Sequence, residues 1–547
     1  MKKMKRITAI LLALLICVAV AACGDSDTQT TDTPTDTGTP PAGNTPTPTL
    51  SGEGVVTGGD IEPPPEGAKF ADRIEILTEM PLTMVDCYHP AGGGNGERAV
   101  YRCIFDRLVI HTRDNEILPE LATRWETNDH QTFTFYLRED VYFHNGQKFT
   151  SQDVLDTIWW AQEYGVGSNG YEGWRDVVSS RAINDYTVEI TLNAVNVDFL
   201  WLISQSVCSI INRAAREADS LWGLWVGTGA FSVVDQLAND HMTLERNDDY
   251  WGEAPTTKTI NFQFVPEMAA RAIMLQNGEA HMAMAVGPED LQMFMDDPVN
   301  YTIFNGVHNL LWNLYLNHKN PITGDWNFRM AVAHALNIPE IAVVAVGIQA
   351  IIPSDGSAWG YAGEFRNTDI PLFAQDLDLA RDYLAASSYN GEPVVMMAGI
   401  PPNIAVQDLI AEQLGEIGIN IEIYNTDNAS IIAMDQNNPE TQIINGLSPF
   451  SGLAASARNM FLPTGGANRG KYDNQEVIDL LMRAPSVADR AEREAMYKRV
   501  QEIVAEEVYM LPLFYRMSPI IASSAVGGFA HESDHDCDYR YIFMVVD

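Results

Sequence analysis

The sequence predicts a mixed α/β fold that is divided into two or more lobes. Segments 132–137 and 187–192 alternate apolar and polar residues, as half-buried strands do. Segments 378–386, 406–417 and 490–508 carry apolar residues at the spacing of amphipathic helices. The chain has 547 residues, 46% of them apolar, whereas single cores usually stop growing at about 250 to 300 residues. We therefore expect strands and helices to intermix along a body with more than one core.

Residues 1–22 have the pattern of a secretory signal. Four basic residues precede an apolar run, 7–20, which is shorter than the roughly 20 residues that a membrane span needs. The next residues, Val20-Ala21-Ala22-Cys23, resemble the lipobox of bacterial lipoproteins. This resemblance implies that Cys23 receives a lipid and fastens an extracytoplasmic protein to the cell membrane, on the cell surface or in the periplasmic space. Cleavage nearby by an ordinary peptidase and an uncleaved anchor are the alternatives.

Residues 23–66 are predicted to form a disordered tether. They are rich in Thr, Pro, Asp and Gly and have almost no apolar residue before Leu50, so they cannot bury enough surface to offset their ordering entropy. Repeated Thr-Pro pairs favour an extended, semi-rigid spacer. Farther along, 199–211 and 341–352 are too short to span a bilayer.

The net charge argues against nucleic acid as a partner. The chain holds 34 Lys and Arg against 73 Asp and Glu, a formal net charge of −39, and nucleic-acid binding depends on basic surfaces. Apart from Cys17 in the signal and the lipidated Cys23, the chain has four cysteines: Cys87, Cys103, Cys208 and Cys537. Their pairing is left open, because an oxidising exterior permits one or two disulfides and buried thiols are the alternative.

One catalytic motif has to be weighed. His531-Glu532-Ser533-Asp534-His535 fits the H-E-x-x-H zinc pattern, which works only on a helix. The segment follows a Gly-Gly pair, lacks an amphipathic stripe and leads into a strand-like run, so we expect a loop without zinc. Since no nucleophile elbow, phosphate loop or spaced CxxC pair occurs either, the sequence predicts no enzyme and no cofactor. A secreted zinc hydrolase is the weakest alternative.

Several separated blocks are similar to the family 5 solute-binding proteins of ABC importers, which include oligopeptide- and dipeptide-binding proteins. The first block comprises 118–125, 132–146 and 150–154. The second comprises Gly227-Thr228-Gly229-Ala230-Phe231 and 244–252, where Ala230 replaces the usual proline. Matches near 271–279, 317–337, 472–474, 510–513 and 526–529 follow in the same order. The family pattern marks packing more than ligand contact, so we expect Trp125, Tyr250 and Trp251 to be core anchors and Gly227 and Gly229 to be turn glycines.

The resemblance implies a two-lobed periplasmic-binding-protein-like fold of class II, the large peptide-binding type, with a hinge between the lobes. Lobe I would comprise 67–306, with an extra subdomain at about 90–195, and lobe II would comprise 307–516. Residues 517–547 would return to lobe I. The lobes would close on a ligand.

Three places are expected to contact the ligand by alignment with the family. They are the loop at Thr78-Glu79-Met80-Pro81, the crossing into lobe II at Asn309 to Asn313 with Trp312, and a third place formed by two separate segments. The residues of that third place are Gly446, Leu447, Ser448 and Phe450, together with Phe514, Tyr515 and Arg516.

The third place also holds a departure from the family. Peptide-binding members usually carry Trp and Asp after the glycine, and the carboxylate pairs with the peptide's amino terminus, whereas Leu447 and Phe450 stand here. An unpaired buried ammonium would cost several kcal/mol, so another carboxylate must approach or the ligand lacks a free amine. The resemblance implies a monomeric receptor that delivers peptides to ABC permease subunits, with an oligosaccharide or another small solute as the alternative.

Overall fold

The structure is a computed structural model. It describes residues 55–56, 63–79, 81–82, 86–89, 95–112, 116–166, 168, 170–304, 310–360, 364–399, 405–426, 430–431, 434–435, 441–449, 457–465, 467–516, 519–533 and 536–546. All of them belong to one compact unit, Thr47–Asp547. Cys23 and the predicted signal lie outside the described residues.

The first sheet takes strands from both ends of the described chain. Its order is β1-β14-β21-β13-β3-β12-β11-β10. The strands are β1 (Val55–Val56), β3 (Arg73–Thr78), β10 (Phe231–Leu237), β11 (His241–Arg246), β12 (Thr259–Phe264), β13 (Met282–Met284), β14 (Tyr301–Phe304) and β21 (Ile520–Ser523). The apolar residues Ile520, Ile521 and Ala522 are buried where β21 pairs with β13 and β14. The chain therefore returns to this sheet near its C-terminus.

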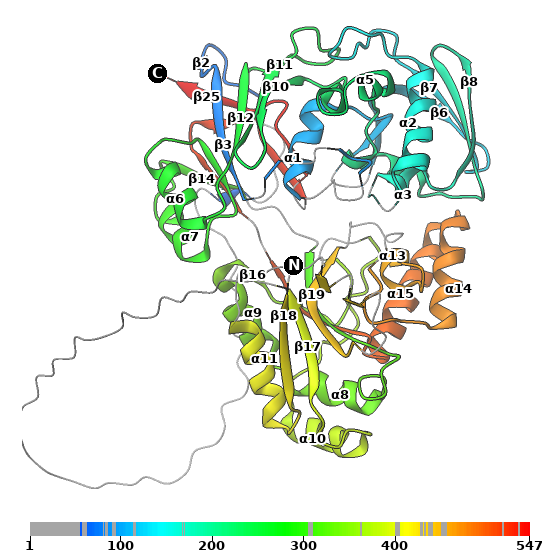
Figure 1. Ribbon diagram of the computed structural model, residues 1–547, viewed down its shortest axis with the longest axis vertical. Helices are drawn as coiled ribbons and strands as arrows, with labels where there is room; N and C mark the ends of the chain where they lie inside the picture. Colours follow the sequence, from blue (N-terminus) through cyan, green and yellow to red (C-terminus); the bar gives the residue numbers. More distant parts are fainter. Residues whose placement is uncertain are drawn as a thin grey trace, which may run out of the picture. The chain divides into compact units, whose positions relative to one another are not determined.

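The second sheet lies between two separate hydrophobic cores. Its order is β16-β20-β15-β19-β17-β18, with β15 (Leu310–Leu316), β16 (Ala350–Ile351), β17 (Val394–Gly399), β18 (Ile421–Thr426), β19 (Ile443–Pro449) and β20 (Met510–Arg516). Leu314 and Ile443 pack in one core with α8 (Trp326–Ala335), α9 (Ile338–Val346) and α11 (Ala405–Glu416) (Figure 1). Tyr315 and Ile444, the next residues along β15 and β19, pack in the other core with α13 (Ala457–Phe461), α14 (Gln475–Arg483) and α15 (Arg490–Glu506).

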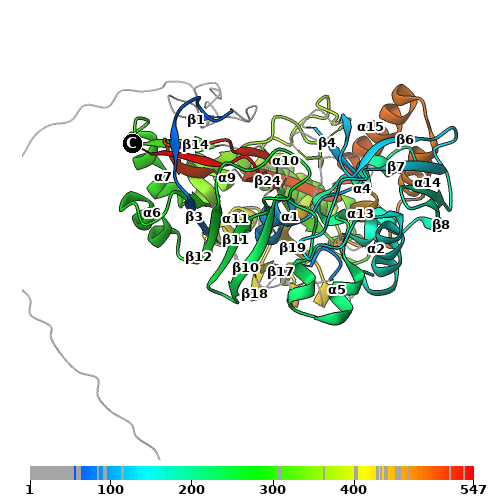
Figure 2. The same cartoon turned by 90° about the horizontal axis from the view of Figure 1, so that it is seen from above.

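A four-stranded antiparallel sheet confirms the two predicted strands. Its order is β6-β7-β9-β8, with β6 (Ala122–Glu126), β7 (Thr132–Leu137), β8 (Val177–Asn184) and β9 (Thr187–Leu192). Every second residue of β7 and β9 is buried, as the alternation predicts. Figure 2 shows this sheet with α2 (Ser151–Tyr164) at the opposite end of the body from α6 (Met268–Gln276) and α7 (Pro288–Met295).

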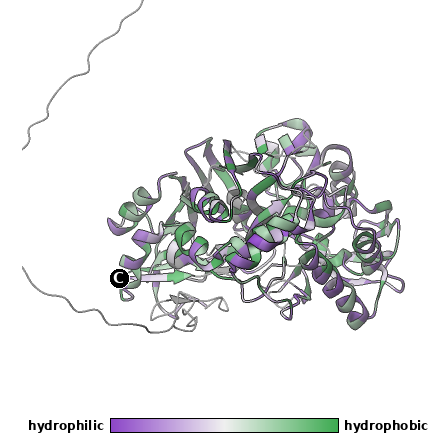
Figure 3. Cartoon of the chain, turned by 90° about the horizontal axis from the view of Figure 1, so that it is seen from below, coloured by the Kyte–Doolittle hydropathy of each residue, from purple (hydrophilic) through white to green (hydrophobic). Residues whose placement is uncertain are grey.

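The predicted helices are also confirmed, with ends within two residues of expectation. The segments at 378–386, 406–417 and 490–508 form α10 (Leu377–Ala386), α11 and α15. The side chains of Asp376 and Asp489 accept backbone N–H groups at the first turns of α10 and α15, which satisfies donors that a helix start leaves open. Figure 3 shows hydrophobic and hydrophilic residues on different faces of the helices.

The remaining elements are short. The other helices are α1 (Asn95–Ile104), α3 (Tyr171–Trp174), α4 (Phe199–Ile203), α5 (Arg213–Ala218), η1 (Ser206–Cys208), η2 (Trp222–Trp225), η3 (Gly347–Gln349) and η5 (Ala484–Ser486). The other strands are β2 (Lys69–Phe70), β4 (Val109–His111), β5 (Ile117–Pro119), β22 (Val526–Gly527), β23 (Ala530–Ser533), β24 (Asp536–Asp538) and β25 (Phe543–Val546). β25 pairs with β2 and β22 (Figure 1), which adds a second link between the C-terminus and the early chain.

Asp106 explains why the aromatic residues of the second sequence block pack where they do. Its buried carboxylate accepts hydrogen bonds from Trp251 Nε1 at 2.9 Å, from the Thr228 hydroxyl at 2.9 Å and from the Tyr250 hydroxyl at 3.3 Å. Tyr250, Trp251 and Trp125 also pack against the hydrophobic core. The prediction that these aromatics are packing anchors is confirmed.

The prediction for Gly227 and Gly229 needs a correction. Neither residue has a positive φ, so a left-handed turn is not the reason for glycine. A Cβ on Gly227 would lie 1.9 Å from the carbonyl oxygen of Ile104, and one on Gly229 would lie 2.5 Å from that of Cys103. Both glycines let two backbone segments touch.

The four cysteines of the body are buried thiols rather than disulfides. Cys87, Cys103, Cys208 and Cys537 are buried free thiols. Burial raises the pKa of Cys208 to about 12 and raises the pKa values of Cys87 and Cys103 even further, so these thiols stay protonated and weakly nucleophilic.

Part of the predicted tether is ordered. Val55–Val56 lies within 23–66, yet it forms β1, parallel to β14 at the edge of the first sheet. Two adjacent β-branched residues favour such an extended edge, so disorder does not hold for this pair. Among the described residues, no single helix is long and apolar enough to cross a membrane, although α8 and α9 pass that test as a pair bent by 63°.

Candidate functional site

The structure brings two of the three predicted places together. β15 lies between β19 and β20 in the second sheet, so Trp312 is in register with Leu447 on one side and Phe514 on the other. Ser448 and Arg516 belong to the same strands. Thr78 and Glu79 lie at the end of β3 in the first sheet, while Asn309 and Phe450 lie outside the described residues.

Trp312 is held in place by two contacts. Its ring stacks on Phe514, with centroids 5.6 Å apart and an angle of 11° between the ring planes. Its indole Nε1–H donates a hydrogen bond of 2.6 Å to Asn445 Oδ1. The indole is half-buried against the core. Its ring therefore forms a fixed aromatic surface near the start of β15. Sequence reasoning missed Asn445, although it directly precedes the predicted Gly446.

A cation and an unpaired acceptor lie around Gly446. Gly446 is in register with Asn313 on β15, and Asn313 is fully buried with its Oδ1 lacking a hydrogen-bond partner. One terminal nitrogen of Arg469 lies 3.5 Å from the point that a Cβ on Gly446 would occupy. The acidic residue that peptide-binding members of the family carry after this glycine is missing here. The described charged group beside Gly446 is instead the guanidinium of Arg469. Asn313 lies in the predicted crossing segment, whereas Arg469 belongs to no predicted contact segment.

Several predicted contact residues are almost fully buried. Tyr515 is fully buried, and its hydroxyl donates to the Trp359 carbonyl at 2.5 Å. Phe514 is 1% exposed, beneath Trp312. Thr78 is 1% exposed, and its hydroxyl donates to the Gln263 carbonyl at 3.4 Å. These side chains can shape the site but present little surface to a ligand.

A polar contact joins the predicted lobes away from these residues. The Val197 N–H donates to the Pro485 carbonyl at 3.0 Å. Beside this bond, Asp198 is 6% exposed and its Oδ2 has no hydrogen-bond partner. Burial, with the charge of Glu364, raises the pKa of Asp198 to about 6, although Arg493 and Arg458 act in the opposite direction. At neutral pH the carboxylate is therefore mostly charged, and no described residue donates a hydrogen bond to its Oδ2.

Asp198→Asn is expected to stabilise the protein at pH 7.5 and to change little at pH 4. A carboxyl group whose pKa is higher in the folded than in the unfolded chain binds more protons when folded, so its contribution to stability falls as pH rises between about 4 and 6. The gain at pH 7.5 should be on the order of 2 kcal/mol. Urea denaturation at the two pH values measures it, and an equal effect at both would rule out the titration of Asp198 as its cause.

The described part of the H-E-x-x-H segment is a strand. Ala530–Ser533 is strand β23, paired in a hairpin with β24, so the expected loop is a β-hairpin and the helix that the motif needs does not form. His535 lies outside the described residues. No group of three or more His, Cys, Asp or Glu side chains in the described chain could hold a metal ion.

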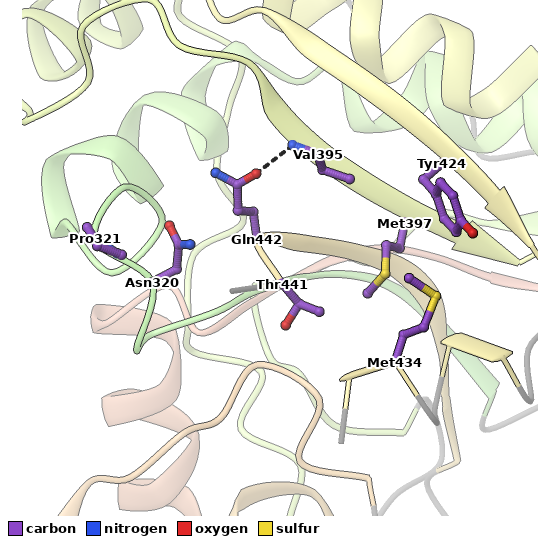
Figure 4. Close-up of a pocket in the computed structure, with 8 residues that line it drawn as sticks. All are labelled: Asn320, Pro321, Val395, Met397, Tyr424, Met434, Thr441 and Gln442. Atoms are coloured by element: carbon purple, nitrogen blue, oxygen red, sulfur yellow. Dashed lines mark hydrogen bonds between the residues drawn. The ribbon is translucent and has the colours of Figure 1, made fainter. Parts of the chain in front are cut away.

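A cavity of about 430 Å³ lies elsewhere on the second sheet. It is lined by side chains of β17 and β18, of the residues that precede β19, and of the loop that follows β15 (Figure 4). None of the predicted contact residues lines it. The cavity is therefore distinct from the surface around Trp312.

Comparisons with known proteins agree on one family. The profile of bacterial extracellular solute-binding proteins, family 5 Middle, matches residues 116–468. The heme-binding protein A of Haemophilus influenzae is 24% identical over 480 residues, covering 80% of this chain and 86% of that protein. The dipeptide-binding protein DppE of Bacillus subtilis is 23% identical over 461 residues, covering 78% and 84%.

A solved structure shows the same fold. The periplasmic binding protein DppA of Helicobacter pylori, in complex with the peptide STSA, superposes with a TM-score of 0.74 at 23% identity, covering 87% of this chain and 99% of that one. The predicted two-lobed periplasmic-binding-protein fold is therefore confirmed. The relatives' names include heme and dipeptide as ligands, so the family permits more than one class of solute.

Proposed function

Because the chain belongs to the bacterial extracellular solute-binding proteins of family 5, we propose that it captures peptides outside the cytoplasm and delivers them to the permease subunits of an ABC importer. The observation that carries the peptide assignment is the fixed aromatic surface of Trp312 on Phe514 beside Gly446. A flat aromatic face suits peptide side chains, and the neighbouring Asn445 and Gly446 backbone suits amide groups. The protein acts by binding and release and carries out no reaction.

The proposed peptide presents an acidic group near Gly446. The described cation there is Arg469, and a guanidinium matches a carboxylate with two parallel hydrogen bonds. No acidic residue occurs between Gly446 and Gly465, so a free amino terminus at this position would lack a countercharge. A peptide with a blocked amine, or one that places its carboxylate here, avoids that cost.

The domain layout belongs to the same proposal. The chain passes from the first sheet to the second between β14 and β15, and it passes back between β20 and β21. We assign lobe I to 67–306 and 517–547 and lobe II to 307–516, with a hinge between them. The lobes close on the ligand from either side. Lipid on Cys23 keeps this monomeric receptor at the membrane, where it meets the permease at high effective concentration.

A ligand screen by thermal unfolding tests the proposal. The purified chain is heated with di- to pentapeptides, with and without a free amine, and with oligosaccharides. A ligand at 100 times its Kd stabilises the folded form by about 2.7 kcal/mol, which amounts to several degrees in Tm. If oligosaccharides raise the Tm and no peptide does, the peptide assignment is wrong and the sugar alternative, which the Trp312 ring also suits, replaces it.

Trp312→Ala is expected to abolish the peptide-induced shift in Tm, because it removes the aromatic surface at the site. The matched control is Trp326→Ala, since Trp326 is 43% exposed on α8, outside the proposed site. That variant should keep the full shift. Isothermal titration of both variants with the best peptide measures the change in Kd. Equal affinities would exclude Trp312 from the site.

A further inference from the structure

The cavity on the second sheet has a mainly apolar wall. Val395 and Met397 come from β17, Tyr424 from β18, and Met434 from the segment before β19. Figure 4 shows the two thioethers next to each other, with the Tyr424 ring beside Met397. Methionine side chains are flexible and polarizable, so they adapt to flat or branched apolar groups. A volume of about 430 Å³ lies within the range of small-molecule sites.

The polar groups of the cavity differ in how many of their hydrogen bonds the protein already uses. The Thr441 hydroxyl donates to Asp435 Oδ1 at 3.1 Å and accepts from Asn317 Nδ2 at 3.3 Å, so it is committed to the protein. Gln442 Oε1 accepts the Val395 N–H at 2.7 Å, which orients the carboxamide. Figure 4 shows the amide nitrogen of Gln442 on the side away from that bond. No described residue accepts a hydrogen bond from this nitrogen, so it can donate to a ligand.

The cavity is remote from the proposed peptide site. Gln442 precedes β19, whereas Gly446 and Ser448 lie toward its other end. Strands rise about 3.3 Å per residue, which places Ser448 roughly 20 Å from Gln442 along the strand. Trp312 packs against the core of α8, α9 and α11, whereas Met397 and Met434 belong to the core on the other face of the second sheet, so a solute on the Trp312 ring lies on the opposite side from the cavity.

We propose that this cavity is a second binding site, which takes an uncharged small molecule with an apolar ring and one carbonyl group. The ring packs on Met397, Met434 and Tyr424, and the carbonyl oxygen accepts a hydrogen bond from Gln442 Nε2. A neutral ligand is favoured because none of the side chains that line the cavity is charged. The nearby Asp435 and Lys471 already form an ion pair at 2.8 Å, so a ligand charge would be buried without a partner.

Methyl NMR with acetanilide as the probe tests the site, because acetanilide carries one phenyl ring and one carbonyl. In protein labelled at the methionine methyl groups, ring currents should shift the Met397 and Met434 signals together, saturating at millimolar probe. Met396 is the internal control, since it neighbours Met397 on β17 but is buried in the core on the other face of the sheet. Unchanged Met397 and Met434 signals, or an equal shift of Met396, would overturn the proposal.

A single substitution then tests the hydrogen bond. Gln442→Glu keeps an oxygen for the Val395 N–H but removes the donating nitrogen, so the fold is preserved and the Kd for acetanilide should rise about tenfold. Gln236→Glu is the control, because Gln236 lies on β10 in the first sheet; it should leave the Kd unchanged. If Gln442→Glu binds acetanilide as tightly as the parent protein, the assigned carbonyl contact is wrong. Neither experiment needs the transported solute, so failure of the peptide proposal leaves this result interpretable.

Discussion

Arg540→Met is expected to lower the free energy of unfolding by about 3 to 5 kcal/mol, because the buried carboxylate of Asp538 loses its hydrogen-bonded cation and keeps only Arg102, at 4.0 Å. Arg540 donates to Asp538 Oδ2 at 2.6 Å and Oδ1 at 3.0 Å, and it lies 3.4 Å from Glu120 Oε1. All three side chains are at most 11% exposed. Burial alone would raise the pKa of Asp538, but the charges of Arg540 and Arg102 hold it well below its ordinary value. The cluster ties the C-terminal segment to the early chain.

Urea denaturation of the parent and variant proteins at pH 7.5 measures this loss. The matched control is Arg124→Met, since Arg124 pairs with Glu126 where the two side chains are 54% and 61% exposed; exposed pairs contribute at most about 1 kcal/mol. Because the pKa of Asp538 is lowered in the folded chain, the difference between parent and Arg540→Met should shrink as pH falls below about 4. Equal midpoints for both variants at pH 7.5 would contradict the role given to Arg540.

Gly227→Ala is expected to prevent stable folding. The added Cβ would lie 1.9 Å from the Ile104 carbonyl oxygen and 2.7 Å from the Phe105 ring. Both segments are anchored, since Gly227 also accepts the His144 N–H at 2.9 Å and Phe105 is buried. Relief requires a backbone shift, which costs about 3 kcal/mol or more. Soluble yield and the urea midpoint measure the effect.

Gly415→Ala is the control for this prediction. Gly415 lies within helix α11, and nothing is within 4 Å of an added Cβ. Alanine is favoured over glycine inside a helix by up to about 1 kcal/mol, so this variant should be as stable as the parent or slightly more stable. A Gly227→Ala protein with the parent's midpoint would show that the two segments do not touch.

Local patterns were sufficient for much of the fold. Apolar residues recur with the period of the element that they form, so short stretches were enough to predict the strands at 132–137 and 187–192 and the helix at 490–508. The sequence blocks also identified the family, because they mark packing such as the Asp106 hydrogen bonds to Trp251 and Tyr250. The sequence predicted that positions 227 and 229 require glycine. The physical reason is the close approach of their backbone to Ile104 and Cys103, which lie more than a hundred positions earlier in the chain.

The site was predicted less completely than the fold. Alignment predicts ligand contacts at Trp312 and Gly446, which lie on adjacent strands; these contacts stay predictions. Asn445 and Arg469 lie outside the predicted segments, because their place beside these residues depends on strand register and on the packing of the segment after α13.

Periodicity thus predicted the α/β class and several helices and strands, and the resemblance of separate sequence blocks indicated the family, since each of these is written in short stretches. Other features depend on which segments pack together in the folded chain. They are the burial of Tyr515, the unpaired Oδ2 of Asp198, the β-hairpin at His531 and the cavity beside Gln442. A side chain's exposure and hydrogen-bond partners depend on what packs against it, and a linear pattern does not record that.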